Sequence, residues 1–324
     1  MTDIKINIDL LKEFERRLDP SHPEASKIPA KVLGYGEMST VFEIKDESRK
    51  NLAYKRIPIF KYQKELGHYE DMYYKYNRTL KDVIGINVPP WGFTSFPCEQ
   101  GYIVGYDVQE KLPPESFGNK AIHTLNDDDI VTLFRLILRQ LRKVWDFNKE
   151  KTSLEIGIDG QISNWVIKDF DTNNPHIGPE TQLYYVDTST PFIRKHGVEQ
   201  LDPELFLRSA PSFLLWLIRW LFLEDVMTRY YDFHLVVVDL IANFYKEQRP
   251  ELIPRLVEVA NDFFATEATH LNIAPVSIKE VHSYYKEDAL IWTIFLAMRR
   301  LDRFIHKWIL RKPYIYILPG KIKR

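Results

Sequence analysis

The sequence has a single cysteine, almost no net charge and no apolar run long enough to cross a bilayer. Cys98 has no second cysteine with which to form an internal disulfide, and this usage suits a reducing compartment. The 44 basic and 45 acidic residues leave a formal net charge of -1, so the overall charge favours neither a nucleic-acid partner nor an anionic membrane. The most apolar run, residues 213–223, is shorter than a membrane span and contains Arg219, which indicates a buried helix.

Several common signals are also missing. Residues 1–5 are polar and lack the apolar core of a signal peptide, so we expect a cytoplasmic protein with neither a membrane nor a nucleic-acid partner. No His-Glu-x-x-His motif supports a zinc site, and no Gly-x-Ser-x-Gly motif supports a serine hydrolase. A functional site must therefore be found from other residue patterns.

The chain does contain enough apolar residues for a large core. It has 324 residues, of which 45% are hydrophobic and 14% aromatic. Strand-forming patterns dominate up to residue 110, and helical patterns dominate after it. We therefore expect an α+β fold of two lobes, residues 1–110 and residues 111–324, with a ligand-binding cleft between them.

A glycine turn lies between two strand-forming stretches near the N-terminus. Residues 32–44 read Val-Leu-Gly-Tyr-Gly-Glu-Met-Ser-Thr-Val-Phe-Glu-Ile, which predicts a β-hairpin. A Rossmann unit would need a helix directly after the glycines, and here a strand follows them. Gly34, Gly36 and Ser39 are small, which lets backbone amides at such a turn approach phosphate oxygens. The alternative is an ordinary glycine hairpin.

The next strand and helix supply candidate charged residues. Lys55 and Arg56 are neighbours on a short predicted strand, so their side chains point to opposite faces of the sheet. Residues 64–80 predict a helix, from which either Glu65 or Glu70 could reach back to Lys55, and we favour Glu70. In the alternative interpretation these charges are simply solvated.

Three oxygen-bearing side chains occur between residues 156 and 192. Asp159 and Asn164 are five residues apart, and Asp187 follows a strand-like run. Phosphoryl transfer needs such a set: one carboxylate for the proton of the nucleophile, and an amide and a second carboxylate to hold magnesium on the phosphates. The intervening stretch, residues 168–182, is rich in Asp, Asn, Pro and Gly and predicts a lengthened hairpin.

The chain resembles the protein kinase-like superfamily in the order of four features. These are the glycine hairpin, the strand lysine, the Asp-to-Asn loop and the Asp at the end of a strand. The resemblance is to its small-molecule branch in particular, the aminoglycoside and choline kinase-like phosphotransferases. Two positions depart from the pattern of that family. Gly157 replaces the usual His two residues before the catalytic Asp, and Thr188-Ser189 replaces the Phe-Gly that follows the metal-binding Asp.

The resemblance implies a set of residues that contact ATP. Glycines cover the phosphates, and a lysine, oriented by a glutamate, binds them. The backbone of a hinge segment binds the edge of the adenine. The hinge follows a strand predicted at residues 101–110. The implied set is Gly34, Gly36, Ser39, Lys55, Glu70, Gln109, Glu110 and Lys111.

The resemblance also implies the chemistry. Asp159 is the expected catalytic base, and Asn164 and Asp187 are the expected magnesium ligands. The implied function is ATP- and Mg²⁺-dependent phosphotransfer to the hydroxyl of a small-molecule acceptor. The short segment after Asp187 favours a small acceptor over a peptide. The alternative, supported by the departures at Gly157 and at Thr188-Ser189, is a pseudokinase that binds nucleotide or serves as an interaction module.

The second half of the chain is expected to be helical. Asn126 or Asp127 caps a predicted helix that extends to residue 147 beneath the catalytic loop. Long apolar helices follow through residue 305. We expect the basic tail, residues 307–324, to be a solubilising terminus.

Overall fold

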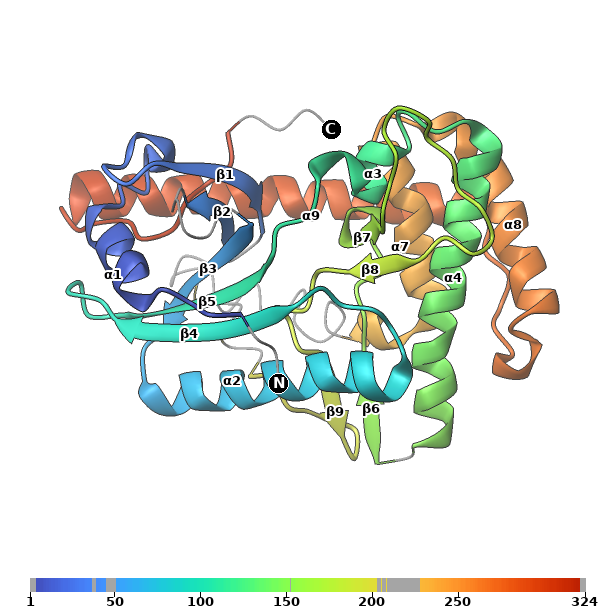
Figure 1. The fold of residues 1–324 in the computed structure, drawn as a ribbon, viewed down its shortest axis with the longest axis horizontal. Helices are drawn as coiled ribbons and strands as arrows, with labels where there is room; N and C mark the ends of the chain where they lie inside the picture. Colours follow the sequence, from blue (N-terminus) through green and yellow to red (C-terminus); the bar gives the residue numbers. More distant parts are fainter. Residues whose placement is uncertain are drawn as a thin grey trace.

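The computed structural model describes residues 4–36, 39–44, 51–151, 153–202, 205, 208 and 228–320. These residues form a five-stranded antiparallel sheet in the N-terminal part and a mainly helical C-terminal part (Figure 1). This arrangement confirms the predicted α+β class and agrees with a two-lobed layout. The last strand of the sheet ends at Glu110, where we placed the boundary between the lobes.

The N-terminal sheet has the strand order β1-β2-β3-β5-β4. Its strands are β1 (Ala30–Tyr35), β2 (Thr40–Ile44), β3 (Leu52–Phe60), β4 (Trp91–Pro97) and β5 (Ile103–Glu110). The predicted glycine hairpin is confirmed, because β1 pairs with β2 in antiparallel register. Strand β4 was not predicted from the sequence, in which Pro89 and Pro90 directly precede it. An edge strand tolerates Pro97 because one of its sides has no strand to hydrogen-bond with.

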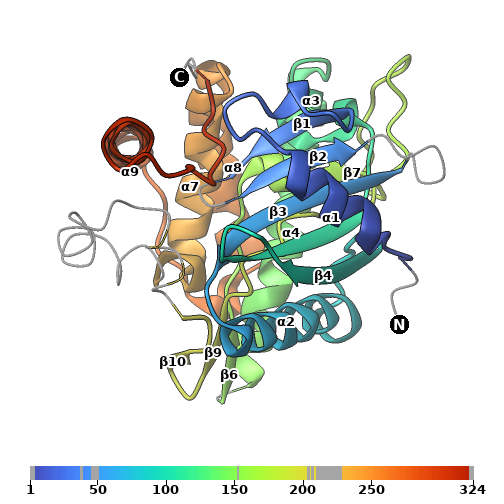
Figure 2. The same cartoon turned by 90° about the vertical axis from the view of Figure 1, so that its left-hand side faces the viewer.

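Helices cover the two faces of this sheet. Helix α1 (Ile8–Arg17) crosses one face, where Phe14 meets the ring of Phe42 edge-on at 5.2 Å between centroids (Figure 2). Helix α2 (Gln63–Arg78) packs against residues of the other face through Tyr69, whose ring lies 5.6 Å from that of Phe93. Side chains that alternate along β3 therefore face α1 on one side of the sheet and α2 on the other.

The C-terminal segment contradicts our expectation of a solvated tail. Helix α9 (Ile278–Phe304) runs past both parts of the molecule and brings the end of the chain back to the N-terminal sheet (Figure 1). There Ile317 and Leu318 are buried, and the guanidinium of Arg56 donates a hydrogen bond to the carbonyl oxygen of Ile315 at 2.8 Å. Apolar burial outweighs the basic composition of the tail, at least up to residue 320.

The helical part consists of four principal described helices and several short strands. The helices are α4 (Asp127–Glu150), α7 (Phe233–Lys246), α8 (Ile253–Thr266) and α9, and a short helix, α3 (Gly118–Ala121), precedes them. The short strands are β6 (Leu154–Ile156), β7 (Trp165–Ile167), β8 (Leu183–Tyr185), β9 (Ile193–Lys195) and β10 (Val198–Glu199). The predicted hairpin is confirmed, because β7 pairs with β8 across residues 168–182.

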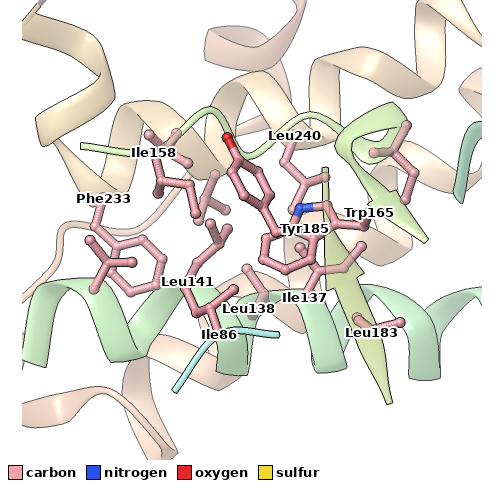
Figure 3. Packing of buried hydrophobic residues seen from close by; sticks show 14 of the residues in the cluster. Ile86, Ile137, Leu138, Leu141, Ile158, Trp165, Leu183, Tyr185, Phe233 and Leu240 are labelled. Carbon is pink, nitrogen blue, oxygen red and sulfur yellow. The ribbon is translucent and has the colours of Figure 1, made fainter. Parts of the chain in front are cut away.

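Helix α4 forms the base of this part, as the sequence predicted. The side chain of Asn126 accepts a hydrogen bond from the backbone N–H of Asp129, which makes Asn126 the cap. The apolar stripe of α4 is buried, and Figure 3 shows Ile137 and Leu141 packed beneath Tyr185 of β8. This core holds the hairpin and the loop before it in place.

Some expectations fall on residues that the structure does not describe. The predicted apolar helix at residues 213–223 lies outside the described residues. In the part of the chain that is described, no helix is long and apolar enough to cross a membrane.

Candidate active site

The β7–β8 hairpin brings two of the expected magnesium ligands together. Asn164 directly precedes β7, and Asp187 lies two residues after the end of β8. The backbone N–H of Val186 donates a hydrogen bond to the carbonyl oxygen of Asn164 at 3.0 Å. The antiparallel pairing therefore fixes Asn164 beside Asp187, although 22 residues lie between them in the sequence.

Lys55 connects the N-terminal sheet to this hairpin. Its ammonium Nζ lies 2.8 Å from Oδ1 of Asp187, and about a quarter of each side chain is exposed. Burial by itself raises the pKa of Asp187, but the Lys55 ammonium and the Ser189 hydroxyl outweigh burial and hold the net pKa below its usual value. The site thus contains an ionised carboxylate and a cation that solvent can reach.

Asp159 lies in a loop that is held by hydrogen bonds at several points. Its carboxylate oxygen Oδ1 accepts the backbone N–H of Gln161 at 3.1 Å, and its carbonyl oxygen accepts the amide of Asn164 at 3.3 Å. The indole of Trp165 donates to the carbonyl oxygen of Gly160, also at 3.3 Å. These contacts place Asp159 and Asn164 side by side.

The pKa of Asp159 is raised to about 7. Burial is the main cause, and the neighbouring carboxylates of Asp239 and Asp187 add to it because like charges disfavour ionisation. A carboxylate with such a pKa can both accept and release a proton near neutral pH. Asp239 is a buried residue of α7 that sequence reasoning did not identify.

Gly157 is closely surrounded by neighbouring residues. A Cβ atom at this position would come within 3.0 Å of both the Cβ of Phe192 and the carbonyl oxygen of Tyr230. Its own carbonyl oxygen accepts the hydroxyl of Tyr76 at 2.8 Å. The loop is therefore positioned by backbone contacts with neighbouring elements, and a histidine at position 157 would require Phe192 and Tyr230 to shift.

A model described as "Family of unknown function (DUF6206)" matches residues 20–303. The chain belongs to this family. No curated protein matches the sequence significantly. The matched region includes each candidate residue from Gly34 to Asp187, but not the segment around Ile315 that contacts the sheet.

Besides Asp239, two further residues near the site were not identified from the sequence, Asp107 and Tyr69. Asp107 lies directly opposite Lys55 in the β3–β5 register and is 3% exposed. The hydroxyl of Tyr69 on α2 lies 3.1 Å from Oδ2 of Asp107 and 2.7 Å from the carbonyl oxygen of Ser189. A signal was present in the sequence, since an aspartate in the middle of an apolar strand is unusual and marks a buried charge that needs an explanation.

The expected pair of Glu70 with Lys55 is not formed in this structure. Lys55 makes its ion pair with Asp187, and the other candidate, Glu65, pairs with Arg208 at 2.6 Å. The physical reason is the rotation of α2, which turns Tyr69 toward the sheet and leaves Glu70, one residue further round the helix, half-buried elsewhere.

The glycine residues lie at the end of the β1–β2 hairpin, as expected. Gly34 pairs with Val41 next to a register shift in β1. The backbone N–H of Gly36 donates to the carbonyl oxygen of Ser39 at 3.0 Å, which closes the turn. A Cβ atom on Gly36 would approach the hydroxyl of Ser39 to 2.6 Å, so a larger residue there would require the Ser39 side chain to turn away. Residues 37 and 38 are outside the described residues.

The hinge residues are placed between the two parts, but their backbone donors are already used. The N–H of Glu110 donates to the carbonyl oxygen of Pro90 at 3.1 Å, and that of Lys111 donates to Asn51 at 2.7 Å. The side-chain amide of Gln109 donates to the hydroxyl of Thr188 at 3.2 Å. The next N–H along the chain belongs to Leu112, since Pro113 and Pro114 have none.

Proposed function

We propose that this protein is a phosphotransferase with a protein kinase-like fold, which transfers a phosphoryl group from ATP to the hydroxyl of a small molecule. The observation that carries the proposal is the contact between Lys55 and Asp187. These residues are separated by 132 positions and come from the two expected parts of a nucleotide site. The Asp159–Asn164 loop lies beside them, so the patterns that resemble the family in sequence order also meet in space.

An ordinary stabilising ion pair is a weaker explanation of this contact. A partly exposed ion pair contributes at most about 1 kcal/mol, and this one lies beside two further acidic groups, Asp107 and Asp159. Such a cluster of buried carboxyl groups around one ammonium costs stability in a protein that has no use for it, because burial makes each of them hard to ionise. It is favourable where a cation and a polyphosphate bind, since each then has a partner.

The residues present fit a magnesium ion. Asn164 and Asp187 offer an amide oxygen and a carboxylate, and Mg²⁺ prefers one or two such protein ligands together with phosphate oxygens. Bound there, the ion would neutralise charge on the phosphates. Lys55 would then exchange Asp187 for a phosphate oxygen. Asp159, with its pKa of about 7, is suited to accept the proton of the acceptor hydroxyl.

A small acceptor is favoured by the short connection that follows Asp187. Strand β9 begins at Ile193 and pairs with β6, so only a few residues separate the metal-binding position from the next fixed element. A long segment on which a peptide could lie has no place there. Adenine recognition in this arrangement depends on Leu112, because the N–H groups of Glu110 and Lys111 are used within the protein.

A pseudokinase is the second candidate function. It is favoured by the turn after Asp187, where the buried hydroxyl of Thr188 is bound by Gln109 and the hydroxyl of Ser189 donates to Asp187 at 3.1 Å. A turn fixed in this way could serve a static module. Such a module would bind nucleotide without transferring phosphate.

Nucleotide-dependent stabilisation tests the proposal. Thermal unfolding is measured with and without ATP and Mg²⁺ for the wild type, for Asp187→Ala and for Asp262→Ala. Asp262 is a matched control because its carboxylate pairs with Arg135 on the far helices α4 and α8 at 2.7 Å. Saturating Mg-ATP adds about 2.7 kcal/mol at a hundred times its Kd, and only Asp187→Ala should lose the magnesium-dependent part. Equal shifts in all three proteins, or no shift in the wild type, would remove the proposal.

A further inference from the structure

Two hydrogen-bond acceptors compete for the single hydroxyl proton of Tyr69. Its oxygen lies 2.7 Å from the carbonyl oxygen of Ser189 and 3.1 Å from Oδ2 of Asp107. A tyrosine hydroxyl has one proton to donate, whereas a carboxylate and a carbonyl can only accept. The shorter contact is to Ser189, so an ionised Asp107 would face the Tyr69 oxygen lone pair without a proton between them.

A proton on Asp107 resolves this competition. The carboxylic acid then donates to the oxygen of Tyr69, and Tyr69 donates to Ser189. The ion pairing of Lys55 agrees with this state, because Lys55 lies directly opposite Asp107 in the sheet and yet makes its ion pair with Asp187. Burial raises the pKa of Asp107 to about 8, with Asp187 adding to the effect and Lys55 and the Tyr69 hydrogen bond opposing it.

The surroundings of Asp107 contain no other source of charge compensation among the described residues that face it. Strand β3 contributes Lys55, and β4 contributes the apolar Phe93 as the opposite cross-strand neighbour. Helix α2 contributes Tyr69 and Tyr73, whose pKa values are raised far above neutrality by burial. Both tyrosines are therefore neutral donors over the range in which Asp107 changes its charge.

We propose that Tyr69, held by a protonated Asp107, is the positioning residue through which α2 orients the Asp187–Ser189 turn for metal binding. In this arrangement α2 contacts the turn through the hydroxyl of Tyr69, and it does not contact Lys55 through the carboxylate of Glu70. When Asp107 is neutral, Asp187 is the only one of these two carboxyl groups that forms an ion pair with Lys55. When a metal ion takes Asp187, Lys55 is then free to turn to an anionic ligand.

The metal-binding role of the turn rests on the proposed function, whereas the order of the hydrogen bonds among Asp107, Tyr69 and Ser189 does not. Magnesium-dependent and magnesium-free ATP binding are measured by titration for Tyr69→Phe, Asp107→Asn, Asp107→Leu and Tyr74→Phe. Tyr74 is the control on the same helix, since its hydroxyl is directed to Phe93 and not to the turn. One hydrogen bond is worth about tenfold in an equilibrium constant.

The variants have distinct expected results. Tyr69→Phe and Asp107→Leu should weaken the magnesium-dependent binding about tenfold and change magnesium-free binding less than about twofold. Asp107→Asn should stay within about twofold of the wild type, because a neutral amide can still donate to Tyr69. The inference is overturned if Asp107→Asn loses as much as Asp107→Leu, since the carboxylate charge would then be the active feature. It is also overturned if Tyr69→Phe binds like the wild type.

A second measurement needs no nucleotide and separates failure of this inference from failure of the proposed function. The carboxyl ¹³C resonance of Asp107 is assigned by its absence in Asp107→Asn and followed with pH in the unliganded protein. It should report a protonated acid at pH 7. An acid that ionises below pH 5 overturns the inference whether or not ATP binds. A protonated acid in a protein that binds no ATP supports the hydrogen-bond order and rejects only the phosphotransferase.

Discussion

The hydroxyl of Tyr76 on α2 donates a hydrogen bond to the carbonyl oxygen of Gly157, at 2.8 Å in a fully buried position. This contact ties a helix of the N-terminal part to the loop that carries Asp159. The backbone N–H of Gly157 is bound on its other side by Phe192 at 3.0 Å. The loop is therefore positioned by two parts of the chain that are distant in sequence.

Tyr76→Phe should destabilise the protein by about 1–3 kcal/mol, because the carbonyl oxygen of Gly157 loses its donor in a place that water does not reach. Urea unfolding measures the change. Tyr35→Phe is the control, since that side chain is 44% exposed. Equal stability of both variants would mean that the Tyr76 bond does not contribute.

The neighbouring residues Lys55 and Arg56 should give opposite results. Lys55→Ala should abolish most of the stabilisation by Mg-ATP and lower the free energy of unfolding by at most about 1 kcal/mol, as for a partly exposed pair. Arg56→Ala should lower it by about 3–5 kcal/mol, because Glu15 is left buried without its cation. Thermal unfolding with and without Mg-ATP measures both effects.

The double variant Arg56→Met with Glu15→Leu is the control for this pair. Replacing both charges with apolar side chains should recover most of the stability lost in Arg56→Ala. A double variant as unstable as the single one would show that the hydrogen bonds to Tyr102, Tyr106 and Ile315 carry the energy instead of the charge pair.

Asp159→Asn should leave the affinity for Mg-ATP near that of the wild type and reduce turnover by about 10²-fold or more, as expected for loss of a general base. Slow ATP hydrolysis provides the assay when the acceptor is unknown. A base works in its ionised form, so wild-type activity should rise with pH through about 7. Wild-type protein that binds Mg-ATP without hydrolysis above the variant, and without transfer to a panel of hydroxyl compounds, would support the pseudokinase.

Acid should weaken the contact between Glu65 and Arg208. The hydrogen bond and charge of Arg208 outweigh burial and lower the pKa of Glu65 to about 2. A group with a lowered folded pKa contributes stability above its unfolded pKa of 4.5 and loses it as the pH falls toward 2. Glu65→Gln should therefore be less stable than the wild type at pH 6 and approach it near pH 2, measured by urea unfolding across this range. A pH-independent difference would contradict the assignment.

The predictable parts of this site are those set by local geometry. Alternation along a strand was enough to place Lys55 and Arg56 on opposite faces, and turn chemistry was enough to predict both hairpins. Each of these relations is decided within a few residues of the chain.

The unpredicted parts depend on contacts between distant elements. The rotation of α2 about its axis decides whether Tyr69 or Glu70 faces the sheet, and periodicity alone does not fix it because both positions border the apolar face. Asp107 gains its role from Tyr69 and Lys55 on other elements. The bond from Arg56 to Ile315 joins residues 259 positions apart, which no local pattern reports.

The return of residues 313–318 to the N-terminal sheet restricts how the two parts of the molecule can move. The chain passes between the parts after Glu110, and it passes back where α9 leads into the segment held by Arg56. A relative movement of the two parts would therefore have to keep the bond between Arg56 and Ile315 or break it, so the end of the chain acts as a second tie between the parts besides the connection at Glu110.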